Sequence, residues 1–118
     1  MKFKLLEKVN IDDVPEENKH GNCFVVAFNY VMSHPNATLV HGIVTGQGPL
    51  DGLQYNHAWA EEGDTVIDNT INLTVPKLIY YAIGHIKIVK KYSYEQMIDN
   101  ALSYRTYGPW DKELMQYP

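Results

Sequence analysis

The sequence predicts an α+β fold in which an N-terminal helix that carries a cysteine packs on an antiparallel sheet. Three observations predict it. A dense apolar run begins at Cys23, strand-like segments follow at 38–45 and 55–68, and a helix with a recognisable cap begins near residue 93. With 118 residues, of which 45% are hydrophobic and 20% charged, the chain is expected to form a single domain, 1–118, around one modest core.

The first elements lead to the cysteine. Residues 3–9 suit a short strand, and residues 11–20 form a polar loop. The apolar run 24–32, closed by a proline at position 35, predicts a buried helix. Cys23 would then lie in the first turn of that helix, where backbone N–H groups and the helix dipole favour a thiolate.

A strand is expected at 38–45, because this segment is rich in β-branched residues. The glycine-rich segment 46–52 joins it to a second strand that carries His57. It lacks the lysine and the spacing of a phosphate-binding loop, so we interpret it as a flap or a long hairpin turn instead of a nucleotide cradle.

The strand around His57 is expected to turn back on itself as a hairpin. A two-residue turn at 62–63 would set His57 directly opposite Asp68, close enough for a carboxylate to orient the imidazole. A turn at 63–64 would instead move Asp68 opposite Trp59. Hairpin-turn preferences favour the first register.

Downstream, residues 76–84 predict a short helix with Pro76 at its first position, and residues 85–92 predict a strand. The local lysine cluster of this strand, Lys87, Lys90 and Lys91, is typical of charges that protect a sheet edge.

The last predicted helix begins with a capping box, in which Ser93 is the N-cap and Gln96 reaches back to it. Its apolar face consists of Met97, Ile98, Ala101 and Leu102. The aromatic residues of 107–110 are expected to end the helix and fold back onto the core.

Cys23, His57 and Asp68 follow one another in the order that a thiol enzyme needs: nucleophile, base and orienting carboxylate. A lone cysteine beside a helix is more often a small buried core residue. The joint occurrence with the histidine and the aspartate favours the catalytic interpretation.

The motifs of residues 18–72 resemble the papain-like cysteine protease superfamily, and within it the transglutaminase-like branch. The likeness rests on the cysteine at the start of an apolar helix, on a His-x-Trp strand at 57–59 and on an Asp-x-Thr strand at 68–70. It implies acyl-transfer chemistry, with Cys23 as the nucleophile, His57 as the general base and acid, and Asp68 as the residue that orients the imidazole.

The resemblance departs from the papain pattern upstream of the cysteine. Where a glutamine usually completes the oxyanion hole, this chain has Glu17, so that Asn18 and Asn22 become the candidate side-chain donors. Tyr55 and Trp59 flank the histidine and are candidates for the walls of a pocket. The departure weakens the expectation of peptidase activity more than that of amide or thioester chemistry in general.

The composition of the chain argues against some classes of binding partner. A net charge of −4, a pI near 5.6 and the lack of a basic stripe argue against nucleic-acid binding. No segment has the length of a membrane span or a signal peptide, and a lone cysteine cannot form an internal disulfide, so a cytoplasmic setting is expected.

We therefore expect a cysteine-dependent enzyme acting on a peptide or protein substrate, such as a peptidase, amidase, deamidase or transglutaminase. A noncatalytic binding module that keeps the papain-like fold is the alternative. No cofactor is expected. A zinc site made from His20, Cys23, His41 and His57 is conceivable but disfavoured, because the chain has no compact set of Cys/His pairs.

Overall fold

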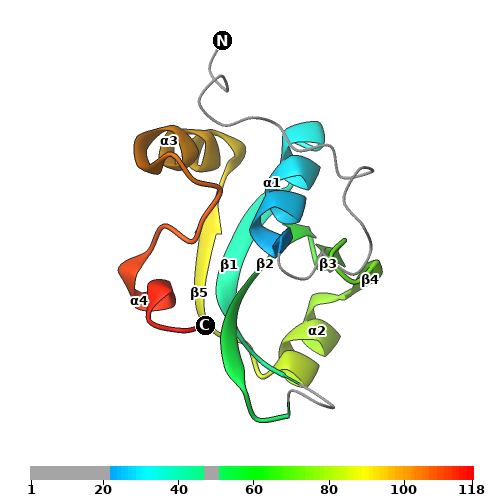
Figure 1. Ribbon diagram of the computed structural model, residues 1–118. Coiled ribbons are helices and arrows are strands. Elements are labelled where there is room, and N and C mark those ends of the chain that lie inside the picture. Colours follow the sequence, from blue (N-terminus) through cyan, green and yellow to red (C-terminus); the bar gives the residue numbers. More distant parts are fainter. Residues whose placement is uncertain (1–21, 47–50) are drawn as a thin grey trace.

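The computed structural model describes residues 22–46 and 51–118. Its fold is α+β, with the cysteine-bearing helix packed on a five-stranded antiparallel sheet and a further helix near the C-terminus, as the sequence predicted (Figure 1). The strand expected at 3–9 and the loop expected at 11–20 lie outside the described residues. In chain order the elements are α1 (Cys23–Ser33), β1 (Thr38–Thr45), β2 (Gln54–Glu62), β3 (Thr65–Asp68), β4 (Leu73–Pro76), α2 (Lys77–Gly84), β5 (Lys87–Tyr92), α3 (Tyr94–Tyr104) and α4 (Lys112–Met115).

The sheet has the order β4-β3-β2-β1-β5, and the long hairpin of β1 and β2 forms its centre. The two strands pair from Thr38 opposite Glu61 to Thr45 opposite Gln54. Beyond this end the Gly46 N–H donates to the Leu53 carbonyl at 2.7 Å. Most of the predicted glycine-rich flap, residues 47–50, lies outside the described part of the chain.

The predicted register of the β2–β3 hairpin is wrong. Glu62 pairs with Thr65, so the turn lies at 63–64 and not at 62–63. Gly63 has a φ of +58°, which suits the first central position of a type II′ turn, where a positive φ is needed. Continuing this register sets Asp68 opposite Trp59, two residues along the same face from His57.

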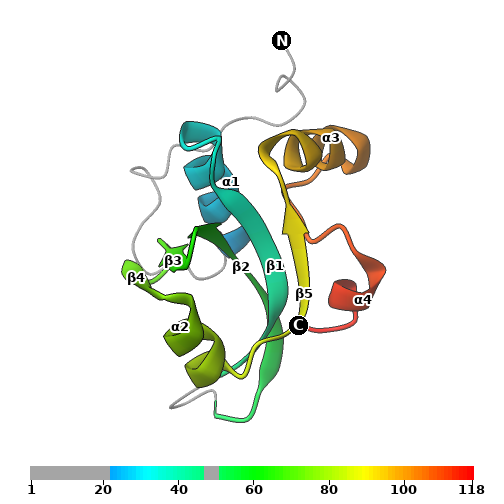
Figure 2. The same ribbon diagram turned by 180° about the vertical axis from the view of Figure 1, so that it is seen from behind.

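Helix α1 covers one face of the sheet, in front of β2 in Figure 1 and behind β1 in Figure 2. Ala58 and Ala60 are the β2 residues on this face, and both are buried in the same cluster as Phe28 and Val31 of α1. Small side chains on the strand let the helix backbone approach closely. The helix ends where the His34 N–H donates to the Val31 carbonyl, just before Pro35, which cannot continue a helix.

The opposite face of the sheet carries Trp59 and Glu61, and α2 packs over it. Trp59 is fully buried, and its ring lies over Gly42 so closely that a Cβ at position 42 would come within 2.9 Å. The indole N–H donates to the Glu61 carboxylate at 3.0 Å, and the Tyr81 hydroxyl donates to the same oxygen. The buried carboxylate thus joins β2 to α2.

Four elements differ from the expectations: α2, β4, α4 and β5. Pro76 is the last residue of β4 and the N-cap of α2, and not the first residue of the helix. Strand β4 was not predicted, because a strand of four residues gives little alternating pattern. Helix α4, which has a single turn, was not predicted either. Strand β5 begins at Lys87 and not at residue 85, because His85 adopts a left-handed conformation that closes α2.

The C-terminal elements follow the prediction. The Gln96 N–H donates to the Ser93 hydroxyl, and the Ser93 N–H donates to the Gln96 side chain, which completes the capping box of α3. Met97, Ile98 and Ala101 are buried, and Trp110 joins the same core cluster. Leu102 is partly buried against this cluster.

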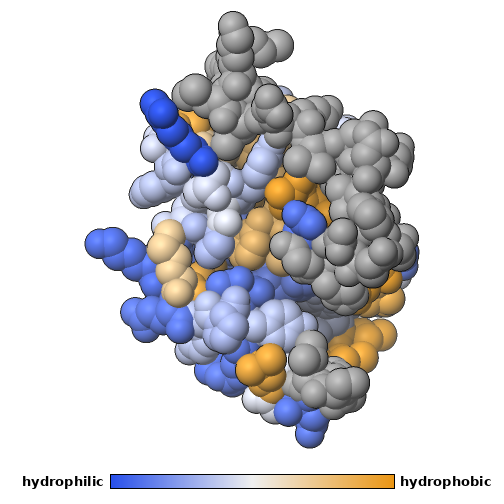
Figure 3. Space-filling model, in the orientation of Figure 1, coloured by the Kyte–Doolittle hydropathy of each residue, from blue (hydrophilic) through white to orange (hydrophobic). Residues whose placement is uncertain are grey.

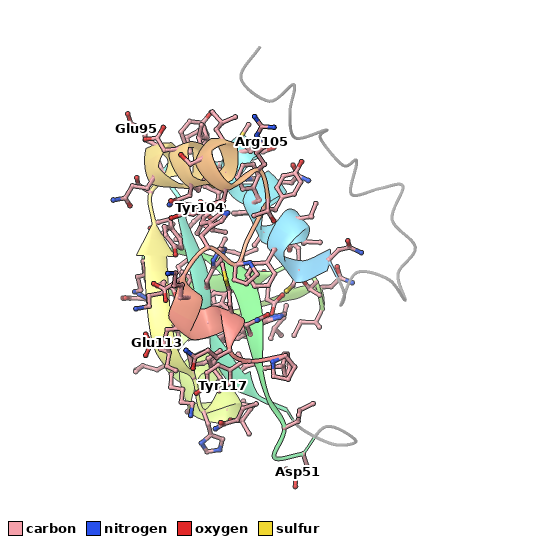
Figure 4. The ribbon with its side chains drawn as sticks, turned by 60° about the vertical axis from the view of Figure 1, so that its left-hand side comes forward. Asp51, Glu95, Tyr104, Arg105, Glu113 and Tyr117 are labelled. Carbon is pink, nitrogen blue, oxygen red and sulfur yellow. The ribbon has the colours of Figure 1, made fainter. Side chains whose placement is uncertain are left out.

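The lysine-bearing strand β5 forms an edge of the sheet. Glu113, labelled in Figure 4, points toward this strand, and Lys90 Nζ lies 3.2 Å from its Oε1. Lys91 Nζ lies 3.2 Å from the buried Glu61 carboxylate. Among the described residues, no helix is both long and apolar enough to cross a bilayer.

His41 lies on the α1 face of the sheet with no exposed surface. Its ring packs against Phe24, Trp110 and Tyr92 at centroid distances of 4.7, 4.9 and 5.1 Å. Within the described part of the chain, neither ring nitrogen has a hydrogen-bond partner. Burial lowers the pKa of His41 to about 3, so the folded protein holds it neutral.

We predict that His41 makes the protein sensitive to acid. The unfolded chain binds a proton at this residue near pH 6.5, whereas the folded chain does not until about pH 3. This group therefore leaves stability unaffected above pH 6.5 and reduces it as the pH falls, by about 2 kcal/mol at pH 5. Denaturant unfolding at pH 7.5 and pH 5 should show that His41→Phe loses about 2 kcal/mol less than the wild type.

The matched control is His85→Asn, which removes an exposed histidine and keeps a residue type that tolerates the left-handed conformation. It should follow the wild type at both pH values. An equal loss of stability in His41→Phe and the wild type would contradict the prediction.

Candidate functional site

The structure brings Cys23, His57 and Asp68 together from three different elements. His57 Nε2 lies 2.8 Å from Asp68 Oδ2, and the His57 ring also hydrogen-bonds the Cys23 side chain. Because Nε2 is engaged by the carboxylate, Nδ1 is the ring nitrogen left for the thiol. The three side chains are buried, with exposures of 5% for Cys23, 7% for His57 and 1% for Asp68.

The contact between Cys23 and His57 is made around an edge of β2. The helix that carries Cys23 packs on the face of Ala58 and Ala60, whereas His57 is on the opposite face, with Trp59. Strand β1 pairs with β2 at His57 and closes one side. On the other side the β2–β3 ladder covers only residues 60–62. The thiol therefore meets the imidazole past the end of β3.

Asp68 is held by more than the histidine. Its Oδ1 accepts a hydrogen bond from the Thr70 N–H at 3.2 Å, and its Oδ2 also accepts one from the Tyr80 hydroxyl at 2.6 Å. These donors come from the β3–β4 turn and from α2. The role of Tyr80 was not predicted, because a tyrosine in an apolar helix gives no signal of a partner twelve residues away.

The electrostatics of the pair favour charged forms. Burial alone would lower the pKa of His57, but the hydrogen bonds to Asp68 and Cys23 and the charges of both outweigh it and raise the pKa to about 10. Burial would raise the pKa of Asp68, but the hydrogen bond and charge of His57 lower it. The imidazole is therefore protonated at neutral pH, between two groups that can carry negative charge.

The two pKa shifts make stability depend on pH in opposite directions. The stabilising contribution of His57 is complete below its unfolded pKa of about 6.5 and is lost as the pH rises toward 10. That of Asp68 is present above the ordinary pKa of an aspartate and is lost in acid as its folded pKa is crossed.

The other site candidates are the oxyanion donors Asn18 and Asn22 and the pocket residues Tyr55 and Trp59. Asn22 is the N-cap residue of α1, directly before the thiol, and its side chain makes no capping hydrogen bond. Asn18 lies outside the described residues. Tyr55 is half-buried beside His57, with ring centroids 6.1 Å apart, and lines a cavity. Trp59, the other candidate for a pocket wall, is fully buried in the core and does not line this cavity.

Of the residues considered for a zinc site, Cys23 and His57 lie together, but His41 does not join them. His41 pairs with Ala58, so it points to the face opposite His57, and His20 lies outside the described residues. In the ranges 22–46 and 51–118, no group of three His, Cys, Asp or Glu side chains is arranged to hold a metal ion.

An open cavity of about 390 Å³ adjoins the site. His57, Asp68, Tyr55 and Tyr80 form its polar end. The rest of its wall is mainly aliphatic and comes from the end of β1, from β4 and α2, and from Ile71 and Ile86 beside them. Such a cavity lies within the size range of pockets that bind small molecules or substrate side chains.

Comparison with protein-family models, with curated proteins and with solved structures finds no match for this chain. The chemistry of the site is therefore inferred from its own geometry.

We predict that Tyr80 stabilises the fold through Asp68. Burial and the Asp68 charge raise the pKa of Tyr80, so its hydroxyl stays protonated and donates. Tyr80→Phe removes a hydrogen bond to a charged, buried acceptor and should lower the free energy of unfolding by about 1.5–3 kcal/mol. Chemical denaturation at pH 7 measures the loss.

The matched control is Tyr104→Phe, which removes the hydroxyl of a tyrosine that is 58% exposed. It should change the free energy of unfolding by less than about 0.5 kcal/mol. Equal losses in the two variants would show that the Asp68 contact contributes nothing specific.

Proposed function

We propose that the protein is a cysteine-dependent enzyme that cleaves or transfers acyl groups, with an amide or thioester bond of a peptide or protein as substrate. The observation that carries the proposal is the continuous set of contacts from Cys23 through His57 to Asp68. Each member comes from a different element, and the carboxylate is buried and fully engaged. A cysteine that only fills space in the core does not require a buried histidine and aspartate beside it.

In the first half-reaction, the Cys23 sulfur attacks the substrate carbonyl carbon, and the thiol proton resides on His57. The carbonyl π electrons move to the oxygen and form a tetrahedral oxyanion. When the oxyanion collapses, the bond to the leaving group breaks and His57 hands its proton to that group. Asp68 keeps the imidazole in the required orientation and stabilises its charge.

In the second half-reaction, a water or an amine attacks the thioester carbonyl on Cys23. His57, now neutral, takes the proton of the attacking group and returns it to the sulfur as the thioester breaks. With water the product is a carboxylic acid, and with an amine it is a new amide. Hydrolysis and transamidation share every residue of this scheme.

Two further features support the proposal. The likeness of residues 18–72 to the transglutaminase-like branch of the papain-like superfamily gives the same roles to the same three residues. The backbone N–H of Cys23 lies in the first turn of α1, where N–H groups have no partner within the helix and can donate to an oxyanion. Asn22, the residue directly before Cys23, is the candidate side-chain donor.

One observation favours a noncatalytic binding module instead. Cys23 is only 5% exposed, and a substrate carbonyl must reach its sulfur. A module that kept the fold without the chemistry would keep a buried, slowly reacting thiol. Reactivity of the thiol separates the two candidates.

We predict that the protonated His57 keeps alkylation of the neighbouring Cys23 fast in mild acid. An ordinary thiol alkylates about a hundredfold more slowly at pH 6 than at pH 8, because the thiolate fraction falls. Paired with a protonated His57, Cys23 should lose less than about tenfold over this range. Mass spectrometry after timed exposure to iodoacetamide measures the rate at each pH, since the chain has one cysteine.

Both His57→Ala and Asp68→Asn should restore a steep pH dependence, whereas the control His85→Ala should not. Circular dichroism at each pH verifies that the variants are folded. If all four proteins show the same steep dependence, the thiol is structural and the binding-module function replaces the enzymatic one.

A further inference from the structure

The wall of the cavity beside His57 is mainly aliphatic, whereas the candidate catalytic residues are polar. Its aliphatic side chains include Val44, Leu73, Val75 and Ile86. Around its rim, Ile71, Ile79 and Ile83 keep 44%, 49% and 58% of their surface exposed. Exposed branched aliphatic residues that gather at one opening mark a surface that a ligand covers.

Figure 3 shows hydrophobic side chains at the surface of the lower part of the molecule, where Figure 1 draws α2. Ile79 and Ile83 of this helix line the cavity, and Leu78 of the same helix is 86% exposed without lining it. The apolar surface is therefore not confined to the cavity, but the part that lines it is continuous with the candidate catalytic residues.

Among the described residues that line the cavity, His57 and Asp68 are the only formally charged groups, and they hydrogen-bond to each other. Tyr80, the next polar member, donates its hydroxyl to Asp68. None of these three groups is left to pair with a charged ligand. The other polar side chains of the described wall, Tyr55 and Thr45, are uncharged, and the aliphatic remainder would desolvate a charged ligand at high cost. The cavity suits an uncharged, aliphatic group.

We propose that this cavity binds an aliphatic group of the substrate, placed beside the bond that Cys23 attacks. The inference rests on the proposed function and deepens it, because the cavity shares His57 with the candidate catalytic centre. An aliphatic chain bound there brings the adjoining carbonyl to the imidazole of His57, which lines the cavity and is the partner of Cys23. Substrate selection thus comes from burial of apolar surface.

The aliphatic chain of the substrate can belong to either side of the scissile bond, and three thioesters distinguish the two possibilities. S-methyl thioacetate is the parent compound, S-methyl thiohexanoate carries an aliphatic chain on the acyl side, and S-hexyl thioacetate carries one on the leaving-group side. Hydrolysis of each is followed by chromatography of the released thiol and acid. The kcat/KM of one longer compound should exceed that of the parent by about two- to fourfold for each methylene buried.

Ile79→Asn tests whether the cavity causes the preference. It puts a polar amide in the wall at a position that is half-exposed, and it should lower the ratio of the longer compound to the parent by at least tenfold. The matched control is Leu78→Asn, an identical change on the same helix outside the cavity. The control should keep the wild-type ratio.

A binding measurement separates the cavity from the chemistry. N-hexylacetamide, titrated by calorimetry into Cys23→Ala, should bind, and it should bind more weakly when Ile79→Asn is added. A protein whose Cys23 alkylates readily, yet which treats all three thioesters alike and binds no N-hexylacetamide, would overturn the cavity proposal alone. Slow, ordinary alkylation of Cys23 would overturn the proposed function, and the substrate inference with it.

Discussion

The structure of the site depends on the buried carboxylate of Asp68. A charged group with 1% exposure is tolerated only when its oxygens accept hydrogen bonds. Its donors are the His57 ring, the Tyr80 hydroxyl and the Thr70 N–H. Because these donors belong to β2, α2 and the β3–β4 turn, satisfying one carboxylate fixes three separate parts of the chain. The orientation of the imidazole is a by-product of that requirement.

The two faces of the sheet contribute differently to the site. The α1 face is apolar and small on β2, so it brings the helix close and sets the height of Cys23. The opposite face carries the buried polar residues His57 and Glu61. Glu61 accepts a hydrogen bond from Tyr81 of α2. His57 bonds to Asp68, which accepts a hydrogen bond from Tyr80 of the same helix. Helix α2 therefore supports the site electrostatically and also supplies part of the aliphatic wall beside it.

The sequence predicted much of the fold but only part of the site. Long segments with a clear pattern, such as α1, β1 and the capped α3, were recognisable because burial and capping leave local signals. The His57–Asp68 contact was expected from the right hairpin but the wrong register, since a positive φ at Gly63 moved the turn by one residue. The contact survives because a diagonal pair on one face lies within reach of long side chains. Tyr80 and the aliphatic cavity arise from tertiary packing of α2, which no local pattern encodes.

The tight turn between β2 and β3 also has a consequence for how the site is assembled during folding. His57 and Asp68 are 11 residues apart, so the loop that must close to join them is short and its entropic cost is small. Cys23 precedes His57 by 34 positions and reaches it only when α1 packs on the sheet. The base and its carboxylate are thus specified by a local hairpin, while the nucleophile is added by long-range core packing. Substitutions that weaken the packing of α1 on the sheet are expected to displace the thiol and to leave the histidine–aspartate pair intact.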